Sequence, residues 1–305
     1  MSDFRIRLVK YYAGQPDPFI LGRFLFSSGL AERECDALLC LAPDESLFSF
    51  KGPRALYWQE ARANLALFHR SLFRRYVRLA ASGQFLSHWN PDRRFYVPHV
   101  THWDTLAINK NPGREDKGIA VVSNRGSSMR RLLGTHRATD LRTRFATHSR
   151  VDLYGKEAIW RRFPRGLFAI PGCPGNYRGE VPGTWGPGAK LELASKYKVM
   201  ICMENTVEPW YFTEKFVDAV RAGCVPIYNA HETVRNGILQ GAKWVDPGDF
   251  QFNVDHTLEL ALGERIEEYW AANEAWLGSA PVAETNYYSV FRRIGEILSA
   301  HTAEK

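Results

Sequence analysis

Short apolar runs alternate with longer amphipathic stretches along the first part of the chain. The segment "FRIRLV" alternates apolar and polar residues in the way a half-buried strand does. Further short apolar runs predict strands at "DALLCLAP", "RALYW", "QFLSHW" and "RFYVPHV". Between them, the stretch from Glu60 to about Leu79 has the length and composition of a helix.

The alternation resumes after Asn109–Gly118, a polar segment with Pro and Gly that is expected to link two domains. Strands are predicted at "GIAVVSN", "VDLYG", "YKVMICM" and "CVPIY", and helices at about 127–146, 189–196 and 213–222. Phe163–Gly188 contains too much Gly and Pro for regular elements and is expected to form a loop. Repeated strand–helix–strand order predicts an α/β fold with parallel sheets and helices on both faces.

The chain of 305 residues is long enough for two such domains, which we expect at 1–115 and 116–305. A last helix is predicted at "NYYSVFRRIGEILSA", and we expect it to pack back on the first domain. Its apolar stripe consists of Tyr288, Phe291, Ile294, Ile297 and Leu298.

Composition narrows the class of protein. With 45% hydrophobic and 24% charged residues, the chain is expected to be globular rather than disordered. It has neither an apolar stretch of roughly 18 residues nor the pattern of a signal peptide, so a cytoplasmic location is expected. The five cysteines are an odd number without a C-x-x-C pair, which argues against a disulfide framework and a zinc site and predicts reduced thiols.

Positive charge is concentrated in the window Arg125–Arg165. This window holds ten Arg and one Lys against three acids, a net charge of +8, whereas the whole chain has +7. Such a window predicts an anionic partner: nucleotide phosphates, anionic lipid or nucleic acid. A solvated basic helix face is an equally good explanation for most of these arginines taken singly.

The segment "ENTVEPWYFTEK", 204–215, lies between two predicted strands at the position where parallel sheets bind ligands. Thr213 is expected to cap the following helix, whose first N–H groups attract an anion, with Lys215 as a mobile charge beside them. Glu214 is either an ordinary first-turn acid or a ligand for ribose hydroxyls. Glu204 and Asn205 either contact the ligand or hydrogen-bond the local turn. Tyr211 and Trp210, next to the cap, are expected to contact the ligand rather than fill a core.

The stretch "YKVMICMENTVEPWYFTEKFVDAVRAGCVPIY" resembles the donor-binding signature of the α1,3/4-fucosyltransferases, glycosyltransferase family ten. In that family a strand ending in F-E-N precedes Y-x-T-E-K and a strand of the type A-x-P-I/V. Met203 stands here in place of the usual aromatic residue. The resemblance assigns Glu204, Asn205, Tyr211, Thr213, Glu214 and Lys215 to the donor nucleotide.

The resemblance continues upstream and covers about residues 54 to 250. "VVSNRGSSMRRLL" is similar to the family's S-N segment, which adds Ser123 and Asn124 to the donor site and gives Arg130 the role of the phosphate-binding arginine. "ALYWQEAR" resembles the segment that carries the catalytic base and assigns this role to Glu60, although Trp58 and Gln59 replace the family's Thr-Gly.

What the resemblance implies is a GT-B fold: two facing Rossmann-like domains with an interdomain cleft, the acceptor in the first and the donor in the second. The implied reaction is inverting transfer of L-fucose from GDP-fucose to a glycan hydroxyl, taken as the 3-OH of GlcNAc or glucose. Glu60 would accept the proton of that hydroxyl, and Arg130 and Lys215 would stabilise the leaving GDP. The chain has no Asp-x-Asp triplet, so nothing in the sequence requires a metal, and stimulation by a divalent metal stays open.

Several alternatives stay open beside this interpretation. The donor could be another GDP-sugar, because contacts to guanine and phosphate do not select the sugar. A nucleic-acid-binding protein is disfavoured, because few aromatic residues interrupt the basic window. His99 and His102 are expected to have a structural role, to line the acceptor pocket or to assist Glu60, rather than to bind a metal. The acceptor could be lipid-linked, with the basic face resting on anionic membrane.

Overall fold

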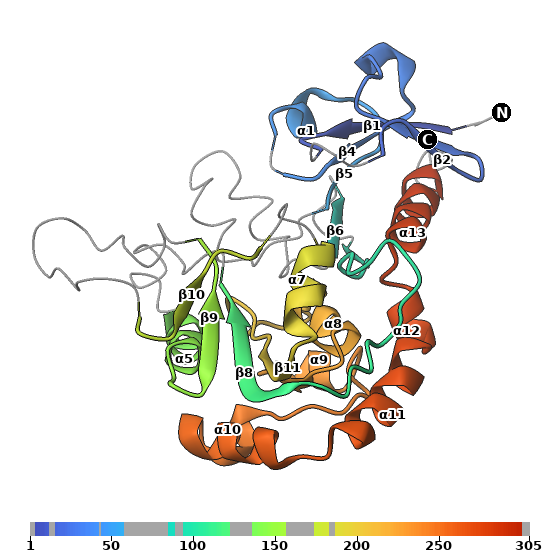
Figure 1. Cartoon of the computed structure of the whole chain (residues 1–305). Helices are drawn as coiled ribbons and strands as arrows, with labels where there is room; N and C mark the ends of the chain where they lie inside the picture. Colours follow the sequence, from blue (N-terminus) through green and yellow to red (C-terminus); the bar gives the residue numbers. More distant parts are fainter. Residues whose placement is uncertain are drawn as a thin grey trace, which may run out of the picture. The chain divides into compact units, whose positions relative to one another are not determined.

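The protein has two compact units, shown in a computed structural model in Figure 1. The structure describes residues 4–11, 16–42, 44–57, 85–88, 94–122, 136–156, 174–182 and 187–300. The first unit comprises Met1–Asp104, Glu208–Tyr211 and Ala283–Lys305, and the second comprises Thr105–Val207 and Phe212–Val282. Thus the chain passes between the units at Asp104/Thr105, whereas the boundary expected from the sequence lies at 115/116.

A seven-stranded sheet forms the centre of the first unit, in the order β2-β3-β1-β4-β5-β6-β7. The four inner strands β3, β1, β4 and β5 pair in parallel, and β2, β6 and β7 are added antiparallel at the edges. The bounds are β1 Phe4–Val9, β2 Phe19–Leu21, β3 Phe24–Ser27, β4 Ala37–Cys40, β5 Arg54–Tyr57, β6 Phe85–His88 and β7 Arg94–Tyr96, with the short helices η1 Glu32–Glu34 and α1 Ser46–Ser49. The strands predicted at β1, β4, β5, β6 and β7 are confirmed, whereas the antiparallel pair β2–β3 was not predicted.

Successive side chains of β4 lie alternately in two different hydrophobic cores. Ala37 and Leu39 face the core that α13 (Tyr287–Ala300) covers, whereas Leu38 and Cys40 face a smaller core closed by Leu47 of α1. Because successive strand residues point to opposite faces, one short apolar run serves both cores. The helix predicted at Glu60–Leu79 lies outside the described residues.

The buried stripe of α13 differs by one position from the predicted one. Tyr287, Phe291, Ile294 and Leu298 are buried, but Tyr288 is 42% exposed. The helical period places residue 288 about 100° around the axis from residue 287, away from the sheet. Including Tyr288 in the stripe was therefore wrong.

Two segments of the first unit are joined by hydrogen bonds close to where the chain leaves and re-enters it. Thr101 N donates to Thr285 O at 3.1 Å, and Tyr287 N donates to His102 O at 2.9 Å. The two threonine hydroxyls lie 2.7 Å apart, and His102 Nδ1 lies 3.0 Å from the hydroxyl of Thr101. Residues 101–102 and 285–287 are thereby fixed to each other.

The second unit is built on a fully parallel five-stranded sheet, in the order β10-β9-β8-β11-β12. The strands are β8 Glu115–Val121, β9 Val151–Tyr154, β10 Tyr177–Gly179, β11 Tyr197–Ile201 and β12 Val225–Ile227. The helices are α5 His136–Ala146, α7 Pro187–Ala194, α8 Glu214–Arg221, α9 Glu232–Arg235, η2 Pro247–Phe250, α10 Val254–Gly263, α11 Ile266–Leu277 and α12 Ala280–Ala283. The predicted strands β8, β9, β11 and β12 are confirmed.

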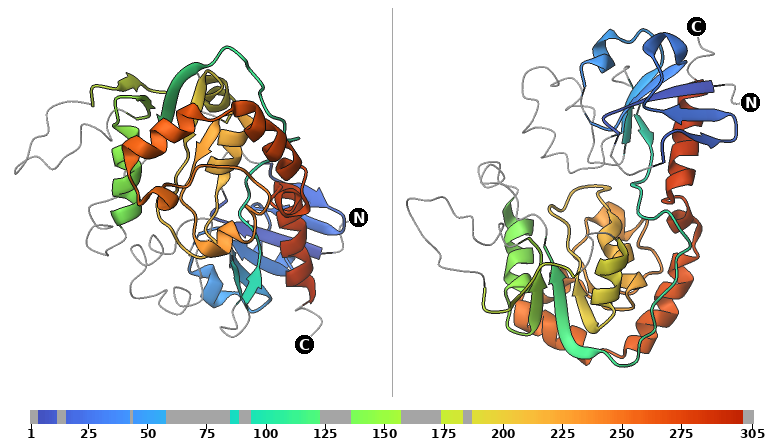
Figure 2. Two further views of the ribbon diagram at one scale, coloured as in Figure 1. Left: turned by 90° about the horizontal axis from the view of Figure 1, so that it is seen from below. Right: turned by 45° about the horizontal axis from the view of Figure 1, so that its top comes forward.

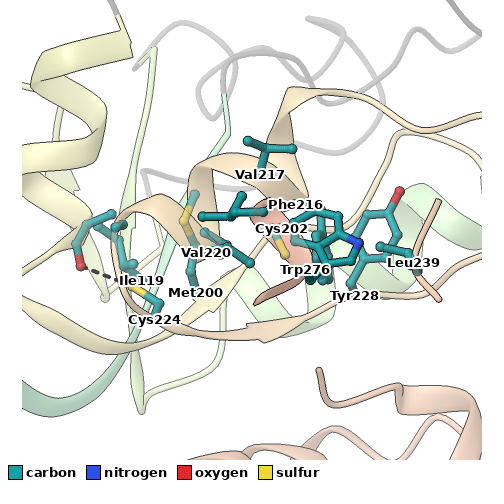
Figure 3. Close-up of a cluster of buried hydrophobic side chains, with 14 of the residues drawn as sticks. Ile119, Met200, Cys202, Phe216, Val217, Val220, Cys224, Tyr228, Leu239 and Trp276 are labelled. Atoms are coloured by element: carbon teal, nitrogen blue, oxygen red, sulfur yellow. Dashed lines mark hydrogen bonds between the residues drawn. The ribbon is translucent and has the colours of Figure 1, made fainter. Parts of the chain in front are cut away.

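Helices cover both faces of this sheet, as predicted (Figures 1 and 2). On one face, Phe216 of α8 and Trp276 of α11 pack edge to face at 5.1 Å between ring centroids (Figure 3). On the other face, Phe145 of α5 and Leu258 of α10 belong to a separate core. The second unit is therefore a three-layer α/β structure.

Two boundaries differ from the sequence prediction. The expected linker Asn109–Gly118 lies within the second unit, where Asn109 N donates to Arg221 O and Glu115 pairs with Tyr197 at the start of β8. The expected loop Phe163–Gly188 contains strand β10. The described cysteines Cys35, Cys40, Cys202 and Cys224 are free thiols. Among the described helices, none is long and apolar enough to span a bilayer.

We predict that Gly223→Ala lowers the free energy of unfolding by about 2 kcal/mol or more. Gly223 ends α8 with φ +73°, its N–H donates to Val220 O, and Cys224 N donates to Ala219 O, as in a Schellman motif. A Cβ at this position would lie 2.1 Å from the carbonyl oxygen of Asn109. The matched control is Gly241→Ala, with φ +88° and open space around its Cβ, which should lose only about 1 kcal/mol. The free energies of unfolding are measured by chemical denaturation. Equal losses of this free energy in the two variants would contradict the steric argument.

Candidate functional site

The candidate site lies where the strand order of the second sheet reverses. The chain proceeds from β8 outward to β9 and β10, and then returns to place β11 and β12 on the other side of β8. In parallel sheets, ligands bind at the carboxyl ends of the two strands that flank such a reversal. Here these strands are β8 and β11. Glu204 and Asn205 follow β11, whereas Ser123 and Asn124, which follow β8, lie outside the described residues.

Glu204 is the buried centre of the described part of this site. Its side chain is 1% exposed. Its Oε1 accepts hydrogen bonds from Thr213 N at 2.9 Å, from Thr213 Oγ1 at 2.6 Å and from Tyr228 OH at 3.3 Å. One carboxylate oxygen thus ties the end of β11 to the start of α8. Of the two interpretations of Glu204, bonding to the turn is what the described contacts support.

Thr213 occupies the N-cap position of α8 in extended conformation, with φ −124° and ψ −174°. Its hydroxyl donates to Glu204, and its side chain does not cap the helix. The predicted position of Thr213 is therefore correct, but the predicted capping bond is wrong: the hydroxyl donates to the buried carboxylate and accepts from Lys215 Nζ instead. Phe216 and Val220 are buried against the sheet, as predicted.

Lys215 is held beside the same carboxylate. Its Nζ lies 3.0 Å from Glu204 Oε2 and 3.6 Å from Glu214 Oε1, and donates to Thr213 Oγ1 at 2.8 Å. Within the described residues, Glu204 Oε2 accepts no hydrogen bond, so the ammonium of Lys215 is its charge partner. Two carboxylates and a hydroxyl thus lie within 3.6 Å of the ammonium of Lys215, and its mobility stays a prediction.

A second buried ion pair supports α8 from α7. Lys190 Nζ lies 2.8 Å from Asp218 Oδ2, with both side chains largely buried. Burial lowers the pKa of Lys190, but the carboxylates of Asp218 and Glu214 outweigh this effect and raise the pKa above its ordinary value. Lys190 therefore stays charged and fixes the first turns of α8 to α7.

Arg142 and Tyr228 are described residues of this site that sequence analysis missed, and Arg142 is the charged one of the two. Arg142 lies on α5 and is 6% exposed, and its guanidinium donates to Asn205 Oδ1. The sequence did contain a signal, because Arg142 shares a helix face with Phe145 and Ala146, both of which are buried. An arginine on an apolar helix face is a better candidate than the exposed arginines of the same window.

The other predicted site residues are distributed as follows. Tyr211 is buried in the segment Glu208–Tyr211, which belongs to the first unit, and Trp210 beside it has a φ of 63°, a region that bulky residues rarely adopt. His99 and His102 are buried in the first unit, with His99 Nδ1 at 2.7 Å from Val100 O. Glu60 and Arg130 lie outside the described residues. Among the residues that the structure describes, no group of three or more His, Cys, Asp or Glu is placed to hold a metal ion.

We predict that Glu204→Gln lowers the free energy of unfolding by about 3 kcal/mol, because it leaves the largely buried ammonium of Lys215 without its nearest carboxylate. The matched control is Glu214→Gln, whose side chain is 44% exposed and whose ion pair with the same lysine should contribute less than about 1 kcal/mol. Urea denaturation measures both variants. Similar losses in the two would mean that Glu204 does not hold the start of α8.

No protein-family model matches the sequence, and no curated protein sequence matches it significantly. Among solved structures, an α1,3-fucosyltransferase is similar over 97% of this chain and 90% of its own, with 15% identity and a TM-score of 0.49. An α1,3-fucosyltransferase with GDP-fucose matches 62% of this chain, with 19% identity and a TM-score of 0.35. The chain spans 49% of the length of the fucosyltransferase structures with GDP-fucose and with GDP.

A third similar structure is an α,α-trehalose-phosphate synthase (UDP-forming) from Burkholderia xenovorans in complex with glucose-6-phosphate. It matches over 88% of this chain and 75% of its own, with 13% identity and a TM-score of 0.51. A likeness at this identity bears on the fold alone. Together with the two sheets described above, it confirms the predicted α/β fold of the GT-B type, with two Rossmann-like units.

Proposed function

We propose that this protein is an inverting glycosyltransferase that moves L-fucose from GDP-fucose to a hydroxyl of a glycan acceptor, the 3-OH of GlcNAc or glucose. The observation that carries the proposal is the cluster at the carboxyl end of β11. There Glu204, Asn205, Thr213 and Lys215, which resemble the donor signature of the fucosyltransferases, lie together beside a strand-order reversal. The shared GT-B fold is compatible with this function but does not select it.

The charges of the site suit a diphosphate that leaves with the nucleotide. Lys215 and the buried Arg142 supply two cationic groups, and the N-terminus of α8 adds a partial positive charge. As the bond to the sugar breaks, negative charge grows on the phosphate oxygens. Groups that are already fixed in place stabilise this charge without reorganising. Glu204 contributes by holding Lys215 and the start of α8.

The remaining roles follow the family resemblance and are part of the proposal. Ser123, Asn124 and Arg130 complete the phosphate side, and Glu214 binds the ribose hydroxyls. Tyr211 contacts the donor, and His99 and His102 contact the acceptor. Glu60 accepts the proton of the acceptor hydroxyl as it attacks the anomeric carbon of fucose from the face opposite GDP, which inverts the configuration.

The donor is tested by a thermal-shift panel in EDTA with GDP, GDP-fucose, GDP-mannose, UDP-galactose and a short DNA oligonucleotide. A ligand at 100 times its Kd stabilises the protein by about 2.7 kcal/mol, which raises the melting temperature measurably. We expect a rise with GDP and GDP-fucose and none with UDP-galactose. A rise in melting temperature with the oligonucleotide alone would contradict the proposal, and so would the absence of a rise with every GDP compound. A larger rise with GDP-mannose than with GDP-fucose would favour another GDP-sugar as donor.

We predict that Glu60→Gln retains GDP binding but lowers kcat by roughly 100-fold or more, because it removes the base and leaves the nucleotide site intact. Release of GDP in the presence of acceptor measures kcat, and titration with GDP measures the affinity. The control is Glu32→Gln, which removes an exposed acid elsewhere in the first unit. Wild-type turnover in Glu60→Gln would assign the base to another residue.

A further inference from the structure

We infer that Trp103 is an acceptor-binding residue whose indole ring stacks on a pyranose ring of the glycan acceptor. The inference rests on the proposed function, and adds to it a residue and the kind of contact that holds the sugar. All the residues that carry it belong to the first unit.

The first sheet has a strand-order reversal of its own. The chain places β2 and β3 on one side of β1, and then β4 and β5 on its other side. Strands β3, β1, β4 and β5 pair in parallel, so their carboxyl ends lie at the same edge of the sheet. At such a reversal a parallel sheet binds its ligand next to the carboxyl ends of the two flanking strands, which here are β1 and β4.

The chain segment that leads to Trp103 is fixed along this edge. At its start, the hydroxyl of Tyr57, the last residue of β5, donates to Pro98 O at 2.5 Å. At its end, Trp103 stacks on Tyr287, with 4.1 Å between ring centroids and an interplanar angle of 17°. The hydroxyl of Tyr287 is hydrogen-bonded to that of Tyr11, which closely follows β1. These contacts connect Trp103 to the carboxyl end of β1.

The ring of Trp103 is held rigidly and is still accessible. Tyr287, on which it stacks, is 1% exposed, whereas Trp103 is 37% exposed. A pyranose ring offers a flat patch of C–H groups with hydroxyls around it, which matches the flat apolar face of an indole. Because Tyr287 already fixes the ring, binding a sugar on it costs little side-chain entropy.

Strained backbone and charged groups mark the same edge of the sheet. Lys10, directly after β1, has a φ of 58°, a conformation that costs a residue with a Cβ about 1 kcal/mol or more. Its ammonium lies 3.6 Å from Oδ2 of Asp44, in the segment after β4. Asp44 in turn accepts hydrogen bonds from the N–H and the hydroxyl of Ser46. This ion pair joins the ends of the two flanking strands and supplies polar groups for sugar hydroxyls.

Trp103→Ala removes the stacking face and should raise the KM for the acceptor roughly 10-fold or more. The KM for GDP-fucose should be unchanged, because the proposed donor site lies in the second unit. Release of GDP with N-acetyllactosamine or lactose as acceptor measures both KM values. Trp103→Tyr keeps an aromatic face, and its acceptor KM should stay within roughly threefold of wild type.

Two further variants separate stacking from packing. Trp103→Leu keeps an apolar contact with Tyr287 but has no ring, so its acceptor KM should rise as in Trp103→Ala. Should Trp103→Ala not fold, Trp103→Leu decides by itself. The matched control is Ile20→Ala, which removes an apolar side chain that is 62% exposed on β2 and should behave as wild type.

Wild-type acceptor KM in Trp103→Ala or in Trp103→Leu would overturn the inference. In the case of Trp103→Leu alone, the surface would be assigned to an apolar group such as an acyl chain. An equal rise in the KM for GDP-fucose would also overturn it, because the residue would then be structural. A wild-type protein that binds GDP-fucose but uses neither disaccharide contradicts the inference, whereas one that binds no GDP compound contradicts the proposed function itself.

Discussion

The arrangement of the candidate site depends on one buried carboxylate. Glu204 follows β11 inside the protein, and such a charge is stable there only if hydrogen bonds and a cation replace the lost water. Thr213, Tyr228 and Lys215 supply them. Thr213 is the N-cap of α8 and Lys215 lies in its first turn. The contacts of these two residues with Glu204 therefore also fix where the helix begins and where Lys215 lies.

Helices on both faces of the second unit's sheet contribute charged groups near this carboxylate. On one face, Phe216 and Trp276 anchor α8 and α11, and the pair Lys190–Asp218 joins α7 to α8. On the other face, α5 brings Arg142 to the end of β11. The helices that stabilise the sheet are therefore the same helices that carry the charged groups of the site.

Sequence analysis predicted the fold well where local pattern decides it. Strand β1 alternates apolar and polar residues, and β11 and the second half of β8 are short apolar runs. Phe216 and Val220 repeat at helical spacing. Sequence analysis failed where a tertiary contact determines the local hydrogen bonding. Thr213 was expected to cap α8, but the buried Glu204 takes its hydroxyl.

The site itself could be located from the order of strands and helices, but its orientation could not. Asn205 was correctly singled out as a strand-end residue, and nothing local says that its oxygen faces an arginine more than 60 positions earlier in the chain. That arginine was counted in the basic window and not distinguished from its exposed neighbours. The antiparallel pair β2–β3 was also missed.

The central claim is that the carboxyl end of β11 binds the diphosphate of a GDP-sugar. The most direct test is a crystal structure of the protein with GDP. The account predicts the diphosphate within hydrogen-bonding distance of the first turn of α8, with Lys215 and Asn205 in contact with the nucleotide. GDP bound elsewhere, with Glu204, Asn205 and Lys215 away from it, would contradict the account.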